Sequence, residues 1–228
     1  SSRRLADRAG ENKPVVVFDI DGTLLDTAPG ILAGFRHALL SVGFEPPDEV
    51  VLRRDLGPPV DAIFTANGLP AAQLAAAVSA YRAFYLTTGL RGRPGDRAPR
   101  RAVMALLHLA RAVAPAMIDA GEGAILVTGN TSAYRGRAHF AGFAPTKAAQ
   151  RVLAESLARS LGPRGIHVAY LAIDAVIDVP WARQQFRDKP DDFFAKPSAI
   201  AEVAFGLAHQ DRSAWAFDVV VRPFCEPW

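Results

Sequence analysis

The stretch that decides the fold is Val15-Val-Val-Phe-Asp-Ile-Asp-Gly-Thr-Leu-Leu-Asp-Thr27. Its first part, Pro14–Phe18, is an uninterrupted apolar run rich in β-branched residues, which predicts a strand buried on both faces of a parallel sheet. Asp19 and Asp21 follow this run directly. Both carboxylates are therefore expected at the carboxyl end of the strand, where open α/β sheets place their ligand sites.

Strands and helices are expected to alternate through the second half of the chain. Helical periodicity is found at about 101–120, 146–161 and 197–209, and strand-like runs at 124–128, 167–173 and 214–221. Alternation at this spacing implies βαβ units. The predicted fold class is therefore α/β, with a three-layer, doubly wound, Rossmann-like parallel sheet.

The region between the first strand and this alternation contains helical segments without strands. They are expected at about 29–40, 49–55, 60–66 and 71–87. The stretch 89–100, rich in Gly, Pro and Arg, is the strongest break in the chain. We predict a core made of residues 1–28 and 94–228, with residues 29–93 inserted as a helical cap.

Length and composition exclude several classes of protein. A chain of 228 residues has room for one enzyme with an accessory domain, and its net charge of +3, spread without runs, does not suggest nucleic-acid binding. The single Cys225 excludes an internal disulfide and a cysteine-based zinc cluster, and suits the cytoplasm. The most apolar long stretch, 102–118, contains His108, Arg111 and Pro115, so no membrane span is expected.

The two acids of the opening stretch can divide the work of phosphate ester hydrolysis. Asp19 would be the nucleophile that forms an aspartyl-phosphate, and Asp21 would protonate the leaving oxygen and then activate water. A carboxylate that attacks a phosphate dianion meets charge repulsion, so a hard cation is needed, and Mg²⁺ is the natural choice. The alternative is a simple turn after a strand or a fragment of a calcium loop, but Leu24 and Leu25 occupy positions where a calcium loop needs oxygen ligands.

The segment Val15–Thr27 resembles motif I of the haloacid dehalogenase superfamily, in the branch that includes phosphoglycolate phosphatases. The resemblance continues through Ile31–Gly43, Gly57-Pro58-Pro59 and Tyr81–Gly89, which are similar to the helical cap of that branch, and it covers about residues 14–95. The resemblance implies that Asp19 is the nucleophile and Asp21 the acid and base. An Asp at the second place implies a phosphatase rather than a dehalogenase.

The same superfamily implies further site residues in the second half. It uses a Thr or Ser at the end of a second strand, a Lys, and acidic residues after a later strand. Thr128, Lys147 and Asp174 stand in that order, with Asp178 close behind. Thr128 would hold a phosphate oxygen, Lys147 would neutralise charge in the transition state, and Asp174 would join Asp19 and Asp21 around Mg²⁺.

A second resemblance covers residues from about 101 to the end, which look like the carboxyl half of a short-chain dehydrogenase/reductase. That family uses a Tyr-x-x-x-Lys pair and a Ser about thirteen residues before the Tyr. Here Phe143 stands in the Tyr place, Asn130 near the Ser place, and Lys147 alone matches. The glycine-rich dinucleotide turn is also missing, because the aspartate motif occupies the first strand.

The sequence thus predicts an Mg²⁺-dependent phosphatase, a hydrolase of the haloacid dehalogenase type, that acts on a small phosphorylated metabolite. No nucleic-acid or membrane partner is expected, and a homodimer is compatible with both resemblances. Two alternatives remain open. One is a reductase-like protein with a degenerate site; the other is a composite chain, joined near residues 93–101, without a complete active site.

Overall fold

The computed structural model describes residues 14–18, 28–56, 58–84, 98–137, 140 and 143–226. Asp19 and Asp21, as well as most of the predicted boundary at 89–100, lie outside the described residues. The described residues include the strand that leads into the aspartate motif and the sheet to which that strand belongs.

The centre of the protein is a four-stranded parallel sheet with the order β1-β2-β3-β6. Its strands are β1 (Val15–Phe18), β2 (Gly123–Gly129), β3 (Ile166–Ile173) and β6 (Asp218–Val221). The central strands β2 and β3 are almost entirely buried, as expected from their largely apolar sequences. The predicted α/β class with a parallel sheet is confirmed.

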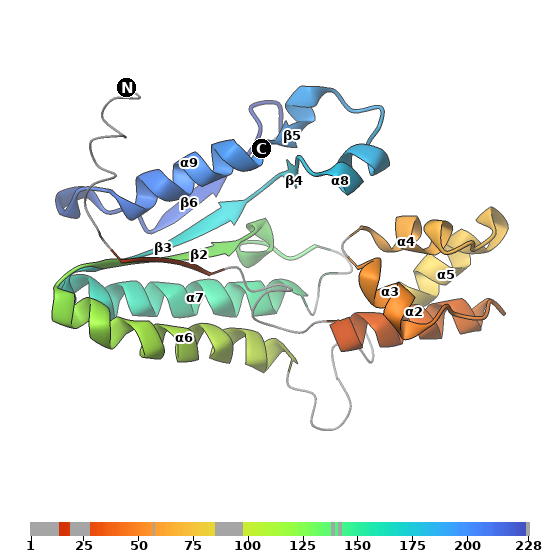
Figure 1. The fold of residues 1–228 in the computed structure, drawn as a ribbon, viewed down its shortest axis with the longest axis horizontal. Helices are drawn as coiled ribbons and strands as arrows, with labels where there is room; N and C mark the ends of the chain where they lie inside the picture. The colour runs from red at the N-terminus through yellow and green to blue at the C-terminus, as the bar shows by residue number, and fades with distance from the viewer. Residues whose placement is uncertain are drawn as a thin grey trace.

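Helices cover both faces of the sheet (Figure 1). Helices α6 (Ala98–Ala120) and α7 (Phe143–Leu161) pack on one face, against Ile125 and Val168 among others. Helix α9 (Pro197–Ala208) packs on the other face, against Leu126 and Leu171. The structure therefore has the three predicted layers.

The connection from β3 to β6 has the opposite hand to the one from β2 to β3. Both connections step in the same direction across the sheet, yet α7 lies on one face and α9 on the other. Because about 98% of such crossovers are right-handed, this is an uncommon arrangement. It makes the chain after β2 and the chain after β3 diverge to opposite faces.

Two strand predictions were wrong in detail. Strand β1 is not buried on both faces, because Val15 and Val17, which share one face, are 37% and 53% exposed. Within the described residues it pairs with β2 alone. The last strand begins at Asp218 rather than at residue 214. A 3₁₀ turn, η5 (Arg212–Ala214), precedes it because the Asp211 side chain accepts a hydrogen bond from the Ser213 backbone N–H.

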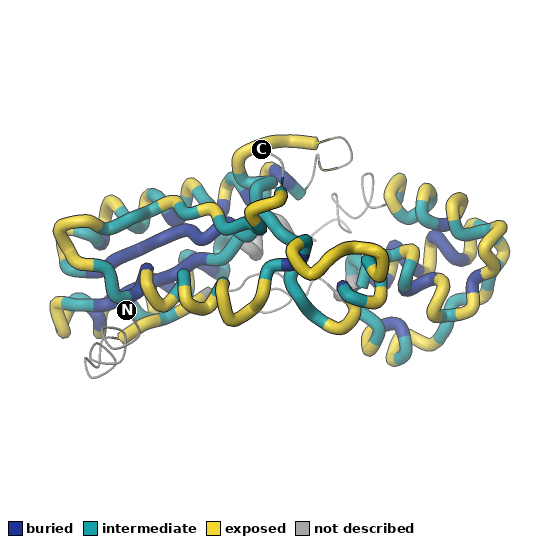
Figure 2. The backbone as a smooth tube through the Cα atoms, turned by 90° about the horizontal axis from the view of Figure 1, so that it is seen from above, coloured by how far each residue is buried: buried dark blue, intermediate teal, exposed yellow. Residues whose placement is uncertain are grey.

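The four helices that follow β1 have a hydrophobic core of their own (Figure 2). They are α2 (Ala28–Ser41), α3 (Glu49–Arg54), α4 (Val60–Ala66) and α5 (Ala71–Phe84). The ring of Phe35 lies at the centre, 5.5 Å from that of Phe64 and 5.3 Å from that of Tyr81 between centroids. In Figure 1 this module lies beyond the carboxyl ends of β2 and β3.

Several short elements complete the described chain. The turn η2 (Thr131–Ala133) follows β2, and η3 (Gly162–Arg164) follows α7. Beyond β3 lie β4 (Val176–Ile177), α8 (Pro180–Gln185), η4 (Asp191–Phe193) and β5 (Phe194–Ala195). Strands β4 and β5 form a separate two-stranded sheet at the carboxyl end of β3, which no pattern in the sequence predicted.

Residues 103–120 of α6 are long and apolar enough to cross a membrane by length and composition, contrary to the expectation from the interrupting residues. In the structure this helix lies against the sheet. Leu106, Ala110, Ala114 and Met117 are buried and recur every three or four residues along one face. That spacing is the one expected of a helix that packs on a core.

Candidate functional site

The candidate site lies at the carboxyl end of the sheet, between β2 and β3. The chain leaves these two strands toward opposite faces, and α/β proteins bind ligands in the crevice outside such diverging strand ends. Thr128 is the next-to-last residue of β2, and Asp174 is the first residue after β3. The structure therefore places these two predicted residues on either side of the crevice.

Asp174 makes several polar contacts in the crevice. Its backbone N–H donates to the Val221 carbonyl at 2.8 Å. The Thr131 hydroxyl donates to Asp174 Oδ1 at 2.7 Å. Asp174 Oδ2 lies 3.9 Å from a guanidinium nitrogen of Arg135 and 3.9 Å from one of Arg222. The Asp174 side chain is 15% exposed and has two cationic neighbours, and neither guanidinium group is close enough to form a hydrogen bond with it.

Lys147 is linked to the same end of β2 through one side chain. It is in the second turn of α7 and only 4% exposed, and its Nζ donates to Gln150 Oε1 at 3.4 Å. Gln150, 1% exposed, donates from Nε2 to the Thr128 carbonyl at 3.3 Å. Two of the predicted residues, Thr128 and Lys147, are therefore joined by a buried polar chain. Gln150 supplies an acceptor to this buried ammonium, which would be costly to bury without hydrogen-bond partners.

Replacing Gln150 with Met is expected to lower the free energy of unfolding by about 1–3 kcal/mol, because it removes an acceptor from Lys147 and a donor from the Thr128 carbonyl inside the core. Urea unfolding followed by circular dichroism measures the change. Gln184→Met, at an exposed position on α8, is the matched control and should leave stability nearly unchanged. Equal stability of both variants would contradict the buried chain.

Asp178 does not join the crevice residues among the described contacts. Arg183 of α8 donates to its two carboxylate oxygens at 2.6 and 2.8 Å, and also pairs with Asp191. The hydrogen bonds from Arg183 lower the pKa of Asp178. Asp178 therefore links the end of β4 to α8, and its lowered pKa reflects this ion pair.

This ion pair should make stability depend on pH in the acid range. Because the pKa of Asp178 is lower in the folded than in the unfolded chain, the pair stabilises the fold above the unfolded pKa and is lost as the pH falls. We expect the urea midpoint to fall further between pH 7 and pH 3 in the wild-type protein than in Arg183→Gln. The same loss in both proteins would show that the pair contributes nothing measurable, as many exposed pairs do.

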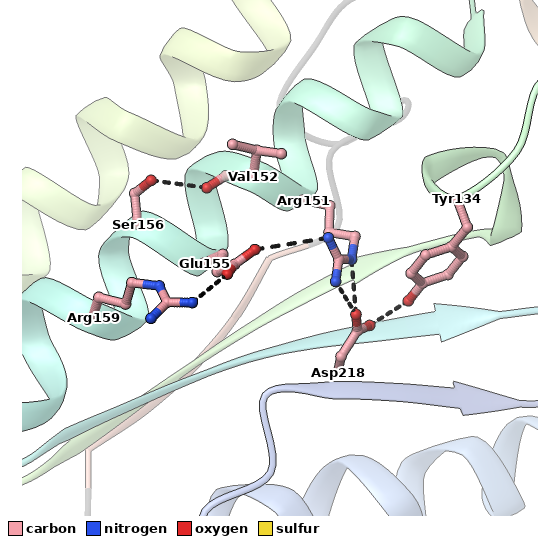
Figure 3. Close-up of polar contacts among 7 residues, drawn as sticks. All are labelled: Tyr134, Arg151, Val152, Glu155, Ser156, Arg159 and Asp218. Carbon is pink, nitrogen blue, oxygen red and sulfur yellow. Dashed lines mark hydrogen bonds and ion pairs between the residues drawn. The ribbon is translucent and has the colours of Figure 1, made fainter.

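A second polar cluster ties α7 to the edge strand β6 (Figure 3). The Tyr134 hydroxyl donates to Asp218, and Arg151 donates from Nε to the same carboxylate at 2.8 Å. Arg151 also lies over the Tyr134 ring, 5.1 Å from its centroid. Burial of the phenol raises the pKa of Tyr134, and the Asp218 carboxylate raises it further. Tyr134 therefore stays protonated at neutral pH and serves as a hydrogen-bond donor.

The described residues contain no group of three His, Cys, Asp or Glu side chains that could hold a metal ion. Of the three predicted Mg²⁺ ligands, Asp19 and Asp21 lie outside the described residues. A pair of carboxylates suits a hard cation. Asp174 suits it less, because its second oxygen already faces Arg135 and Arg222 and a metal ion would have to compete with both.

Three contributors to the crevice were missed in the sequence. Arg222 follows β6 directly, just as Asp174 follows β3, so its position at a strand end was a readable signal. Gln150 lies three residues after Lys147, on the same face of the helix. Arg135 had no such signal, because its place depends on the path of the chain after η2.

Comparison with known proteins divides the chain into two parts. Residues 16–85 match the family model of haloacid dehalogenase-like hydrolases, and residues 96–189 match that of the short chain dehydrogenases. Both resemblances inferred from the sequence are confirmed. Each family model covers less than half of the chain.

Curated relatives match a part of the chain. The tyrosine-protein kinase PtkA of Mycobacterium tuberculosis is 41% identical over 86 residues, which are 38% of this chain and 29% of that protein. The phosphoglycolate phosphatase of Mesorhizobium japonicum is 44% identical over 46 residues, 20% of each chain. The chain thus spans less than a third of the length of these relatives. A solved short-chain dehydrogenase from Rhodopseudomonas palustris is 25% identical. The alignment covers 94% of this chain and 100% of that one, with a TM-score of 0.49.

Proposed function

We propose that the protein is an Mg²⁺-dependent phosphatase that hydrolyses a small phosphomonoester through an aspartyl-phosphate on Asp19. The observation that carries the proposal is the register of β1. Phe18, the last residue of β1, is paired with Val127, the neighbour of Thr128. The strand that leads into the aspartate motif therefore ends at the carboxyl edge of the sheet, one residue short of the level of Thr128.

The groups gathered at that end supply what phosphate chemistry needs. The buried ammonium of Lys147 and the guanidinium groups of Arg135 and Arg222 can neutralise phosphate oxygens. The Thr128 hydroxyl is assigned to one of those oxygens. Asp174 is assigned to hold the two arginines in the crevice rather than to bind metal.

The reaction has two steps in this assignment. In the first, an Asp19 oxygen attacks phosphorus, the bond from phosphorus to the ester oxygen breaks, and Asp21 gives its proton to the leaving oxygen. In the second, Asp21 takes a proton from water, which attacks phosphorus and releases inorganic phosphate and the free Asp19 carboxylate. Mg²⁺, held by Asp19 and Asp21, would reduce the repulsion between carboxylate and phosphate.

The resemblance of residues 16–85 to hydrolases, and to relatives that include a phosphoglycolate phosphatase, supports a small organic phosphate as substrate. The test is hydrolysis of p-nitrophenyl phosphate and of phosphoglycolate, followed as released phosphate, with Mg²⁺ at about 5 mM or with EDTA in its place. Turnover that needs Mg²⁺ is expected. Absence of turnover with both substrates would overturn the proposal.

A reductase-like function is the second candidate, because the dehydrogenase family model matches the longer segment, 96–189. Its weakness is Phe143, which begins α7 where that family has its Tyr and which has no proton to give. Titration with NADH, followed by nicotinamide fluorescence, separates the two candidates. Saturable binding would favour the reductase-like protein; failure of both assays would favour a composite chain without a complete site.

A further inference from the structure

A cavity lies at the amino end of β3, at the opposite end of that strand from Asp174. Its volume is about 330 Å³, within the range of pockets that bind small molecules. It opens between the second half of α7, the start of β3 and the segment that leads into β6. Five residues of β3 separate Val168 in its lining from Asp174, and the two positions are roughly 20 Å apart along the strand. Its lining includes Glu155, Ala158, Arg159, His167, Trp215 and Phe217.

One wall of the cavity is a rigid pair of rings. The imidazole of His167 and the indole of Trp215 are parallel within 4°, with centroids 4.9 Å apart. His167 is 2% exposed, and its Nε2 lies 2.8 Å from the Ala216 carbonyl oxygen, to which it donates. The Trp215 indole N–H donates to the Gln210 carbonyl at 3.2 Å. These bonds hold the wall in place before any ligand arrives.

The charges at the rim of the cavity cancel. Arg159 donates to Glu155 at 2.7 Å along α7, and Figure 3 shows the two side chains meeting at the surface of the helix. The remaining side chains around the opening are mainly apolar or aromatic. An ionic ligand would find no uncompensated charge there, whereas an apolar ring would find aromatic and aliphatic contacts.

We propose that this cavity binds a small, neutral, planar aromatic molecule with one or two rings. Trp215 and Phe217 offer the stacked and edge contacts that aromatic rings prefer. The volume admits such a ring system, and the preformed wall lowers the ordering cost of binding. The site is independent of the proposed phosphatase chemistry.

The probe is benzyl alcohol, and cyclohexylmethanol is its saturated counterpart. Binding to the whole protein is followed by ligand-observed NMR and by tryptophan fluorescence, with Trp215→Phe to identify the responding indole. Benzyl alcohol is expected to bind saturably, about fivefold more tightly than cyclohexylmethanol, because only the flat ring can use the aromatic walls. Equal binding of the two alcohols would overturn the proposal, as would no binding of either.

Filling the cavity gives the second test. Ala158→Leu places a larger side chain in the cavity lining and is expected to weaken benzyl alcohol binding at least about tenfold. Val152→Leu, on an exposed position of the same helix, should leave binding unchanged. Equal effects of the two variants would overturn the site. Light scattering is run on all samples, and a dimer that Ala158→Leu dissociates would overturn it too, by showing that a second copy occupies the cavity instead.

Discussion

Asp19→Asn is expected to abolish Mg²⁺-dependent phosphate release, with a loss of at least about 1,000-fold in kcat, since removal of a covalent nucleophile costs an enzyme several powers of ten. The substitution keeps the size of the side chain and removes the negative oxygen that attacks phosphorus. It also removes one of the two carboxylates assigned to Mg²⁺. The assay is release of inorganic phosphate from p-nitrophenyl phosphate and phosphoglycolate at saturating substrate.

The control for Asp19→Asn is Asp61→Asn, an identical change at an exposed position on α4. It should retain full activity, and circular dichroism should show both variants folded. With p-nitrophenyl phosphate, the activity of Asp21→Asn should lie between those of Asp19→Asn and Asp61→Asn, because p-nitrophenolate is a good leaving group that needs little help from an acid. Unchanged hydrolysis by Asp19→Asn would contradict the assignment and point to a contaminating phosphatase or to another nucleophile.

Gly129→Ala is expected to destabilise the fold by about 3 kcal/mol, at the upper end of what overpacking a core costs. Gly129 ends β2, and a Cβ there would overlap the hydroxyl and the ring carbon that bears it on Tyr170. Tyr170 has no exposed surface and therefore cannot swing away. Thermal unfolding should show a midpoint lower by roughly 6–12 °C for a domain of this size.

The matched control is Gly136→Ala, because a Cβ at Gly136 would meet nothing within 4 Å. Tyr170→Leu removes the obstructing ring. Gly129→Ala should therefore cost less stability in the Tyr170→Leu background than in the wild-type protein. A double-mutant cycle measures that coupling. If Gly129→Ala unfolds at the same temperature as the wild-type protein, Tyr170 does not pack over the end of β2.

Much of the scaffold could be read from local sequence. The largely apolar runs at residues 124–128 and 167–173 correspond to β2 and β3 with shifts of one residue, because a strand buried on both faces has few polar residues. The helix expected at 60–66 appears with those bounds. The helix expected from residue 146 begins at Phe143, since helix ends depend on contacts beyond the local pattern.

The candidate site was predictable only in part. Thr128 and Asp174 follow from a simple rule, since residues at the carboxyl ends of parallel strands share one edge of a sheet. Asp178 was also predicted near this edge of the sheet. In the structure its carboxylate instead pairs with Arg183, and this contact depends on the position of α8. Arg222 also satisfies the rule for strand ends, because it follows β6 directly, whereas Arg135 lies in a loop whose path no local pattern dictates.

The sequence by itself determined the type and order of the four strands of the central sheet and of the described helices other than α8, the two family resemblances and the aspartate motif that follows the first strand. These depend on residue patterns within a few turns of chain. Tertiary structure alone decided that α9 crosses the face opposite to α7, that Lys147 reaches the end of β2 through Gln150, and that two arginines surround Asp174. The physical reason is that each of these features joins residues distant in the chain, whose meeting is selected by packing of the whole core.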